Sequence, residues 1–246
     1  MDSVLLVIDC GNTRYKYLQR RQGGRCTALQ TAVQPSLILD AVPPSRSTIL
    51  LAGAARQVQA VIHDARRLGW LQHQIHILGD DIPLPEMGQY ARCGIDRCCA
   101  GWAAARDESA IVCDFGTATT ITAWRQGPQF LGGVILPGYR ACLAGLHRAA
   151  PALPNIAQQL QDQDSHESIN PLADNTEAAL LAGMQMGYPA MVEACLQEIR
   201  RSSGIDRVVA SGGGMEIIPT AMSQDWHVDK SLVLRGMMSL YDGSAA

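Results

Sequence analysis

The feature of this sequence that most constrains its fold is a short pattern that occurs twice. Residues 4–16 read VLLVIDCGNTRYK, and residues 110–123 read AIVCDFGTATTITA. Each copy is an apolar, β-rich run that ends in Asp, any residue, Gly and then a hydroxyl or amide side chain. Because an internal repeat indicates one structural unit used more than once, we expect two halves built on one plan. Asp9 would then correspond to Asp114, and Gly11 to Gly116.

The chemistry of this pattern points to a phosphate. Short uncharged runs such as Val4–Ile8 are typical of central strands buried on both faces, and the Asp that ends each run would project beyond the sheet. The following glycine permits a positive φ and leaves backbone N–H groups open to a phosphate. Each glycine is followed by a second β-rich run, Tyr15–Leu18 or Thr119–Trp124, which predicts a hairpin turn. Neither GxxxxGK[ST] nor GxGxxG occurs, so a Walker or Rossmann loop is not indicated.

Composition narrows the class of protein. The 246 residues are 47% hydrophobic and 17% charged, with 20 basic and 23 acidic residues and a net charge of -3. This balance, without a basic tract, argues against nucleic acid as the main partner. No apolar run reaches the roughly 18–20 residues of a membrane span, and no charged leader precedes the first strand, so we expect no membrane association, no signal peptide and a cytoplasmic location.

The cysteines favour a reducing compartment over a metal site. There are eight of them, and none forms a CxxC pair. Cys10 and Cys113 lie in or beside the predicted buried strands, where a free thiol behaves as a small hydrophobe. Cys93, Cys98 and Cys99 cluster around residues 94–97, a candidate active-site segment described below, but we assign these thiols no catalytic role.

The rest of the chain alternates strands and helices, which predicts a mixed α/β fold. A βαβ crossover is expected from Thr48–Ala52, Arg56–Leu68 and Gln74–Leu78. Further predicted elements are a helix from Gly94 to about Arg106, a strand at 130–136 with two adjacent glycines, helices at Tyr139–Ala149 and Glu177–Arg201, a strand at Arg207–Ala210 followed by Ser-Gly-Gly-Gly, and a last helix at Leu232–Tyr241.

Two of these segments carry candidate functional residues. Asp96 falls in the first turn of a predicted helix, where a carboxylate is favoured by the helix dipole. From its position alone it is either an ordinary cap or a catalytic base. The three glycines at 212–214 lie between a strand and a helix, where the backbone can approach a phosphate or a flat ring.

Taken together, these segments resemble the actin-like ATPase superfamily, and within it the type III pantothenate kinases. The likeness rests on DCGNTR at the start, GIDR before the middle helix, DFGTATTIT followed by FLGGVILPG, Asn-Thr before the long helix, the glycines after Ala210, and LVLRGM near the end. These motifs occur in the family's order over nearly the whole chain.

The resemblance implies an α/β fold of duplicated ribonuclease H-like domains, with mixed sheets flanked by helices and an active site in the interdomain cleft. The domains would be residues 1–106 and 107–246. It implies ATP-dependent phosphorylation of pantothenate to 4′-phosphopantothenate, the first step of coenzyme A biosynthesis, with Mg²⁺ and a monovalent cation (K⁺ or NH₄⁺), in a cytoplasmic homodimer.

The resemblance also assigns residues to these roles. Asp96 would be the proton acceptor, and Asp114 would hold the monovalent cation. ATP would be bound by Asp9, Cys10, Gly11, Asn12, Thr13, Arg14, Tyr15, Lys16 and Thr117. Pantothenate would be bound by Gly94, Ile95, Asp96, Arg97 and Thr176. We expect Arg97 to pair with the substrate carboxylate, because a guanidinium matches that group bidentately.

One residue departs from the family's pattern. The family has a substrate-binding tyrosine about seven residues before the first glycine of GIDR, and Met87 occupies that place here. Tyr90 lies four residues before Gly94. Either Tyr90 fills the role from a shortened loop, or the contact is absent.

Three alternatives stay open at this point. The first is a kinase of another small alcohol on the same scaffold, although a GxDR helix start suits an acceptor that carries a carboxylate. The second is a nucleotide-binding regulatory protein without turnover, since members of the family have been named accessory factors for gene regulation. The third is a structural ATP-binding module.

Overall fold

The computed structural model describes residues 4–21, 24–40, 42, 47–157 and 170–244. The chain divides into two compact units. Unit 1 comprises Met1–Glu108, Arg125–Phe130 and Ser231–Ala246, and unit 2 comprises Ser109–Trp124 and Leu131–Lys230. The final segment of the chain therefore belongs with the first half of the sequence. No helix in the described ranges combines the length and apolarity needed to cross a bilayer.

Unit 1 is built on a mixed five-stranded sheet with the order β3-β2-β1-β4-β5. Strand β1 pairs antiparallel with β2 and parallel with β4, and β4 pairs parallel with β5. The parallel pair β4 and β5 is joined through α2, which confirms the predicted βαβ crossover. The strands are β1 (Val4–Cys10), β2 (Tyr15–Arg21), β3 (Gln30–Ala32), β4 (Ser47–Gly53) and β5 (Ile75–Ile77), and the helices are α1 (Ser36–Leu39), α2 (Ala55–Arg67), η2 (Gln72–Gln74), α3 (Ile95–Ala104) and α7 (Leu232–Ser244).

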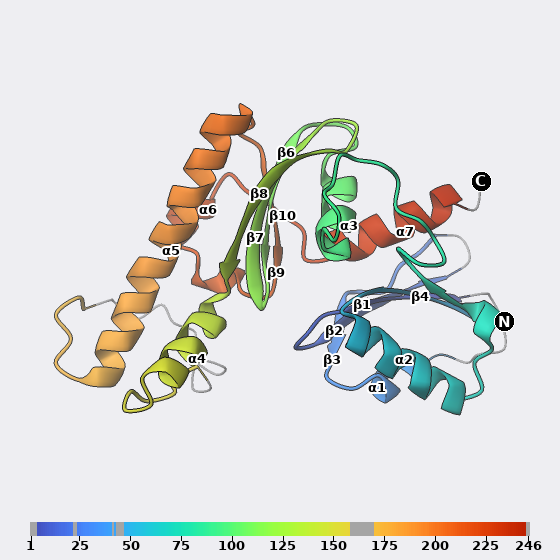
Figure 1. The fold of residues 1–246 in the computed structure, drawn as a ribbon, viewed down its shortest axis with the longest axis horizontal. Coiled ribbons are helices and arrows are strands. Elements are labelled where there is room, and N and C mark those ends of the chain that lie inside the picture. The colour runs from blue at the N-terminus through green and yellow to red at the C-terminus, as the bar shows by residue number, and fades with distance from the viewer. Residues whose placement is uncertain (1–3, 22–23, 41, 43–46, 158–169, 245–246) are drawn as a thin grey trace. The chain divides into compact units, whose positions relative to one another are not determined.

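Helices cover both faces of this sheet (Figure 1). Alternate residues of β1, among them Leu6 and Ile8, pack with α1 and α2 in one hydrophobic core. The intervening residues, Leu5 and Val7, are also buried, and α7 contacts β1 and β4 while α3 contacts β4. Asp9 continues this second row, so its side chain lies on the face of the sheet that carries α3 and α7.

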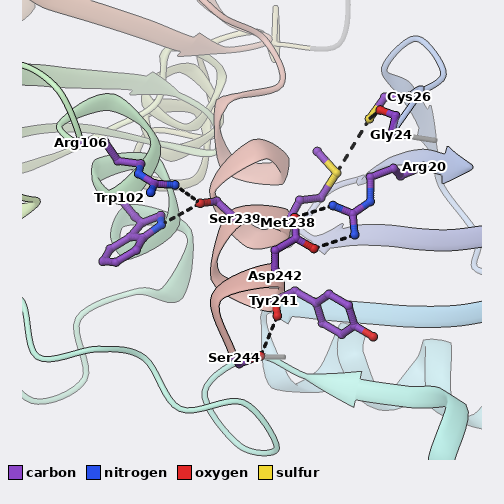
Figure 2. A network of polar contacts seen from close by, with 10 residues as sticks. All are labelled: Arg20, Gly24, Cys26, Trp102, Arg106, Met238, Ser239, Tyr241, Asp242 and Ser244. Atoms are coloured by element: carbon purple, nitrogen blue, oxygen red, sulfur yellow. Dashed lines mark hydrogen bonds and ion pairs between the residues drawn. The ribbon is translucent and has the colours of Figure 1, made fainter. Parts of the chain in front are cut away.

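Helix α7 is fastened to unit 1 by close packing and by polar contacts. A Cβ at Gly236 would overlap the backbone of Cys99 on α3, so these two helices pack in direct contact. Figure 2 shows the polar contacts: Arg20 forms a two-pronged ion pair with Asp242, and the Ser239 hydroxyl accepts hydrogen bonds from Trp102 and Arg106. The last helix thus joins the first sheet to α3.

Unit 2 repeats the arrangement with a five-stranded sheet of order β10-β9-β6-β7-β8. Strand β6 pairs antiparallel with β7 and parallel with β9, as β1 pairs with β2 and β4. The strands are β6 (Ala110–Phe115), β7 (Ala118–Arg125), β8 (Gln129–Pro137), β9 (Val208–Gly212) and β10 (His227–Val228), and the helices are α4 (Tyr139–Ala149), α5 (Thr176–Ser203), η4 (Met215–Ile217) and α6 (Thr220–Ser223).

One face of the second sheet packs on α5. Ile111, Cys113 and Phe115 of β6 contribute to a hydrophobic core that also contains Tyr188 and Val192 of α5. Met184 and Met191 pack against this core, whereas Met186 is half exposed. A Cβ at Gly133 would overlap the Ile121 carbonyl oxygen on β7, whereas none of the surrounding atoms lies within 4 Å of a Cβ at Gly132, so of the two adjacent glycines Gly133 marks a close approach of two strands.

Candidate active site

The first of the two repeated turns, residues 10–15, joins β1 to β2 in unit 1. Asp9 ends β1 with only 7% of its surface exposed, and Lys16 lies directly across from it on β2. Tyr15 is buried, and its hydroxyl donates to Gln57, whose amide donates in turn to the Asn12 carbonyl oxygen. Asn12, Thr13 and Arg14 are exposed at the tip. The turn therefore presents amide, hydroxyl and guanidinium donors on a braced base.

The glycines of the two turns are needed for space and not for a left-handed conformation. Glycine permits a positive φ at both turns, but neither Gly11 nor Gly116 is among the positive-φ residues of the described chain. Instead, a Cβ at Gly11 would lie 2.7 Å from the Arg14 carbonyl oxygen, and one at Gly116 would lie 3.3 Å from the Ala118 carbonyl oxygen. These hairpin turns fold tightly back on their own backbone, which leaves little room for a side chain at either glycine.

The second turn, residues 116–117, lies between β6 and β7 in unit 2. Thr117 is exposed, and its carbonyl oxygen accepts a hydrogen bond of 3.0 Å from the Gly138 N–H, just before α4. Asp114 is half-buried, and the residues directly across from it are Thr120 on β7 and Ser211 on β9. The predicted cation ligand is thus flanked by two hydroxyl residues.

The glycines of the Ser-Gly-Gly-Gly segment have separate roles. Gly212 has a φ of +93°, and a Cβ on it would overlap the Phe115 carbonyl oxygen. The Gly214 N–H donates to that same oxygen. Of the three, only Gly213 has open space where a Cβ would stand, with no heavy atom within 4 Å. Strand β9 also runs on through Ser211 and Gly212, two residues beyond the predicted end. Gly213 is therefore the position of this segment where another molecule can approach the backbone.

The start of α3 in unit 1 brings Asp96 and Arg97 together. Gly94 is the residue before the helix, and a Cβ on it would overlap Oδ1 of Asp96 and approach Nε of Arg97. Oδ1 of Asp96 accepts a 2.8 Å hydrogen bond from the Arg97 N–H. The carboxylate thus bonds within the first helical turn, as a cap would. Asp96 and Arg97 are only partly buried, so both functional groups are accessible.

Tyr90 lies against Arg97. The guanidinium carbon of Arg97 is 5.4 Å from the centre of the Tyr90 ring, and that ring packs at 5.8 Å from Phe130. Partial burial opposes the charge of Arg97, but a hydrogen bond to Tyr90 and the nearby Cys93, Tyr90 and Asp96 charges raise its pKa overall. Met87 is buried, and its carbonyl oxygen accepts from the Phe130 N–H. Tyr90, and not Met87, therefore borders Arg97.

The two buried thiols of α3, Cys98 and Cys99, both have raised pKa values. Burial, together with Cys93, raises the pKa of Cys98 to about 12. Burial raises the pKa of Cys99 well above its ordinary value, with added effects of Cys98, Asp9 and Asp96. Thiols protonated at neutral pH are poor nucleophiles. The same observation places Asp9 and Asp96 within electrostatic reach of one thiol in unit 1.

The remaining site residue, Thr176, begins α5 in unit 2. Asn175 caps this helix by accepting a 2.9 Å hydrogen bond from the Ala178 N–H, and Thr176 is exposed. The residues that the sequence did not single out are Gln57, which braces the first turn, Phe130, which supports Tyr90, and Ser211, which lies beside Asp114. Within the described ranges there is no cluster of three or more His, Cys, Asp or Glu side chains that could hold a metal ion.

Comparison with known proteins decides the family. A family model described as type III pantothenate kinase matches residues 5–198. The chain belongs to the type III pantothenate kinase family. Its relatives include proteins named type III pantothenate kinase from Ruegeria sp. strain TM1040, 34% identical over 134 residues, and from Desulfovibrio desulfuricans, 30% identical over 175 residues.

The alignments with these kinases are partial. The match to the Ruegeria protein covers 54% of this chain and 48% of the relative, and the match to the Desulfovibrio protein covers 68% and 64%. The chain thus spans about half the length of the first curated relatives that it matches.

Solved structures agree on the fold. A Campylobacter jejuni protein described as a Baf family transcriptional activator aligns over 98% of both chains with a TM-score of 0.61 at 20% identity. Component A of (R)-2-hydroxyglutaryl-CoA dehydratase from Acidaminococcus fermentans aligns over 99% of both chains with a TM-score of 0.56 at 12% identity. With the two mixed sheets, this confirms the predicted fold of duplicated ribonuclease H-like domains.

Proposed function

We propose that this member of the type III pantothenate kinase family transfers the γ-phosphoryl group of ATP to pantothenate, giving 4′-phosphopantothenate for coenzyme A synthesis. The observation that carries the proposal is the start of α3. There, the Asp96 carboxylate and the Arg97 guanidinium both lie against Gly94, and the carboxylate also accepts a hydrogen bond from the Arg97 backbone N–H. A carboxylate can accept the proton of a substrate hydroxyl, and a guanidinium can hold a substrate carboxylate.

The residues of the two turns suit ATP and Mg²⁺. The exposed Asn12, Thr13 and Arg14, with Lys16 behind them, are donors of the kind that bind phosphate oxygens. Asp9 is an oxygen ligand of the kind that Mg²⁺ prefers, directly or through water, and Thr117 would contact the nucleotide from the second turn. Bound ATP supplies the phosphoryl group, and Mg²⁺ offsets charge on it. Because phosphoryl transfer has a loose transition state, these residues would act mainly by positioning and charge neutralisation.

Asp96 and Arg97 would act on the acceptor. Among the described residues, Oδ2 of Asp96 has no hydrogen-bond partner, while Oδ1 is held by the Arg97 N–H. Oδ2 would take the proton of the substrate hydroxyl, and the bond at Oδ1 would fix its direction. Arg97 would hold the carboxylate of pantothenate, and Tyr90, supported by Phe130, would keep the guanidinium in place. Gly94, Ile95 and Thr176 would complete the acceptor site.

A monovalent cation, K⁺ or NH₄⁺, is proposed at Asp114. The half-buried carboxylate between two hydroxyl residues is a set of oxygen ligands with a single negative charge, which suits a cation of single positive charge. We also propose a cytoplasmic homodimer. The exposed Leu131 and Ile135 of β8 give apolar surface that a second copy would cover.

The test is pantothenate-dependent ADP release, measured with and without potassium. We expect Asp96→Asn to lower kcat by about 10²–10⁴-fold, because a positioned base contributes that much to proton transfer. The matched control is Asp80→Asn, which removes a carboxylate from an exposed turn of the same unit and should leave the rate unchanged. Near-normal turnover of Asp96→Asn would show that another group accepts the proton.

The alternatives are separated by the same assay. A panel of small alcohols with and without a carboxylate would identify a different acceptor. ATP binding without any turnover would favour a regulatory protein or a structural module. The match to the C. jejuni protein shows the fold alone, so no observation favours either reading.

A further inference from the structure

The side chain of Ser211 lies next to Asp114, the predicted cation ligand, but the sequence alone assigned it no role there. On β6, Cys113 and Phe115 face the hydrophobic core, and Asp114 between them faces the other side of the sheet. On β9, Ala210 belongs to the same core, so Ser211 faces the side on which Asp114 lies. Since Asp114 and Ser211 are directly across from each other in the parallel ladder, their side chains are neighbours.

Thr120 extends this row on the other side. It is directly across from Asp114 in the antiparallel ladder with β7, and its neighbour Ile121 belongs to the core. Residues directly opposite each other on adjacent strands have Cβ atoms about 5 Å apart. Three oxygen-bearing side chains, from Ser211, Asp114 and Thr120, therefore stand in a line across the three central strands of unit 2.

The Ser211 hydroxyl is buried and has no hydrogen-bond partner in the described part of the chain. The residue is only 1% exposed, and its Oγ atom is inaccessible. A buried polar group without a partner is destabilising, and proteins keep few of them. An alanine would fill nearly the same space without that cost. A hydroxyl retained here, beside a carboxylate, indicates a ligand that it meets.

We propose that Ser211 is a ligand of the monovalent cation at Asp114, with Thr120 as a further oxygen on the opposite side. This inference rests on the proposed function, which places the cation at Asp114. A hydroxyl oxygen carries two lone pairs and no charge, so it adds coordination without exceeding the single positive charge of the ion. Hard cations bind such oxygens in preference to sulfur or nitrogen.

The test is thermal unfolding in potassium chloride against choline chloride at equal ionic strength, with Mg²⁺ and ADP in every sample. The wild-type melting temperature should rise with potassium and then saturate, because an ion that binds only the folded state stabilises it. Ser211→Ala should melt at or above the wild-type temperature in choline. Its midpoint for potassium should be higher by about tenfold or more, the cost of losing one ligand.

Two further variants keep the result interpretable. Ser211→Cys keeps the size of the side chain but replaces oxygen by sulfur, so it should also weaken the potassium response. Thr119→Val is the matched control on the core face of the same sheet, where it breaks a buried hydrogen bond to Tyr188. It should melt lower in both salts with an unchanged potassium midpoint.

The outcomes distinguish this inference from the proposed function. If wild type and Asp114→Asn both show no response to potassium, the cation site itself is wrong. If wild type responds, Asp114→Asn does not, and Ser211→Ala keeps the wild-type midpoint, then Ser211 is not a ligand. Destabilisation of Ser211→Ala in choline would also overturn the inference, because it would show that the hydroxyl already has a partner within the protein.

Discussion

The two halves of the molecule share a strand plan but surround their corresponding carboxylates differently. Across from Asp9 lie Lys16 on β2 and Ala52 on β4, whereas across from Asp114 lie Thr120 and Ser211. The row of residues that contains Asp9 therefore includes a lysine, Lys16, whereas the row that contains Asp114 includes two neutral hydroxyl residues. The difference teaches that a duplicated scaffold can place a basic residue across from one carboxylate and two hydroxyl residues across from the other.

The largest effect on activity should come from replacing Lys16, the residue across from Asp9. Lys16→Met leaves the buried Asp9 carboxylate without the ammonium across from it, and it removes a donor for phosphate oxygens. We expect kcat/KM for ATP to fall by about 10²–10³-fold, the usual cost of losing one charge-stabilising donor. Steady-state kinetics check this, and the potassium midpoint should stay at its wild-type value. A change in that midpoint would show that the two rows are not independent.

A smaller effect on turnover is expected from placing a lysine across from Asp114. Thr120→Lys places an ammonium across from Asp114, as Lys16 stands across from Asp9. Turnover in choline should then rise by roughly tenfold over that of wild type, equivalent to about 1.4 kcal/mol of barrier. Rate measurements across a potassium series test this, with a thermal melt to confirm folding. Thr120→Val, which has no charge, should show no gain. An undiminished need for potassium in Thr120→Lys would contradict the counter-charge explanation.

The smallest effect concerns what the halves have in common. Gly53 and Gly212 end β4 and β9 with positive φ, and a Cβ on either would overlap the carbonyl oxygen of Cys10 or Phe115. We expect Gly53→Ala and Gly212→Ala each to lower the free energy of unfolding by about 2 kcal/mol, measured by urea unfolding. The control, Gly213→Ala, has open space and should change stability by less than about 0.5 kcal/mol. Unequal losses at Gly53 and Gly212 would break the similarity of the halves.

Much of the fold follows from local patterns in the sequence. The uncharged run at Val4–Ile8, the helical spacing of Val58, Val61 and Ile62, and the long segment at Glu177–Arg201 each determine structure locally, and the predicted strand and helices were confirmed. The active-site residues are assigned by likeness to the family. Their roles, the domain boundary at residues 106 and 107, and the cleft between the domains stay predictions.

What the sequence could not supply depends on contacts between distant segments. The unpartnered hydroxyl of Ser211 is apparent only once three strands are in register, because its neighbours Asp114 and Thr120 lie about a hundred residues earlier. The tight fit at Gly11 depends on the path of the turn, which composition does not specify. Tyr90 meets Phe130 only because Arg125–Phe130, from the end of β7 to the start of β8, belongs to unit 1.

The membership of α7 in unit 1 has a consequence for how the protein is made. Unit 1 takes its last helix from Ser231–Ala246, after all of unit 2 has been synthesised. During synthesis, Leu5, Val7 and Leu50 of the first sheet stay uncovered by α7 until that helix leaves the ribosome. By then every segment of unit 2 has already emerged. Although domains that emerge first usually fold first, here the half that begins earlier is completed later.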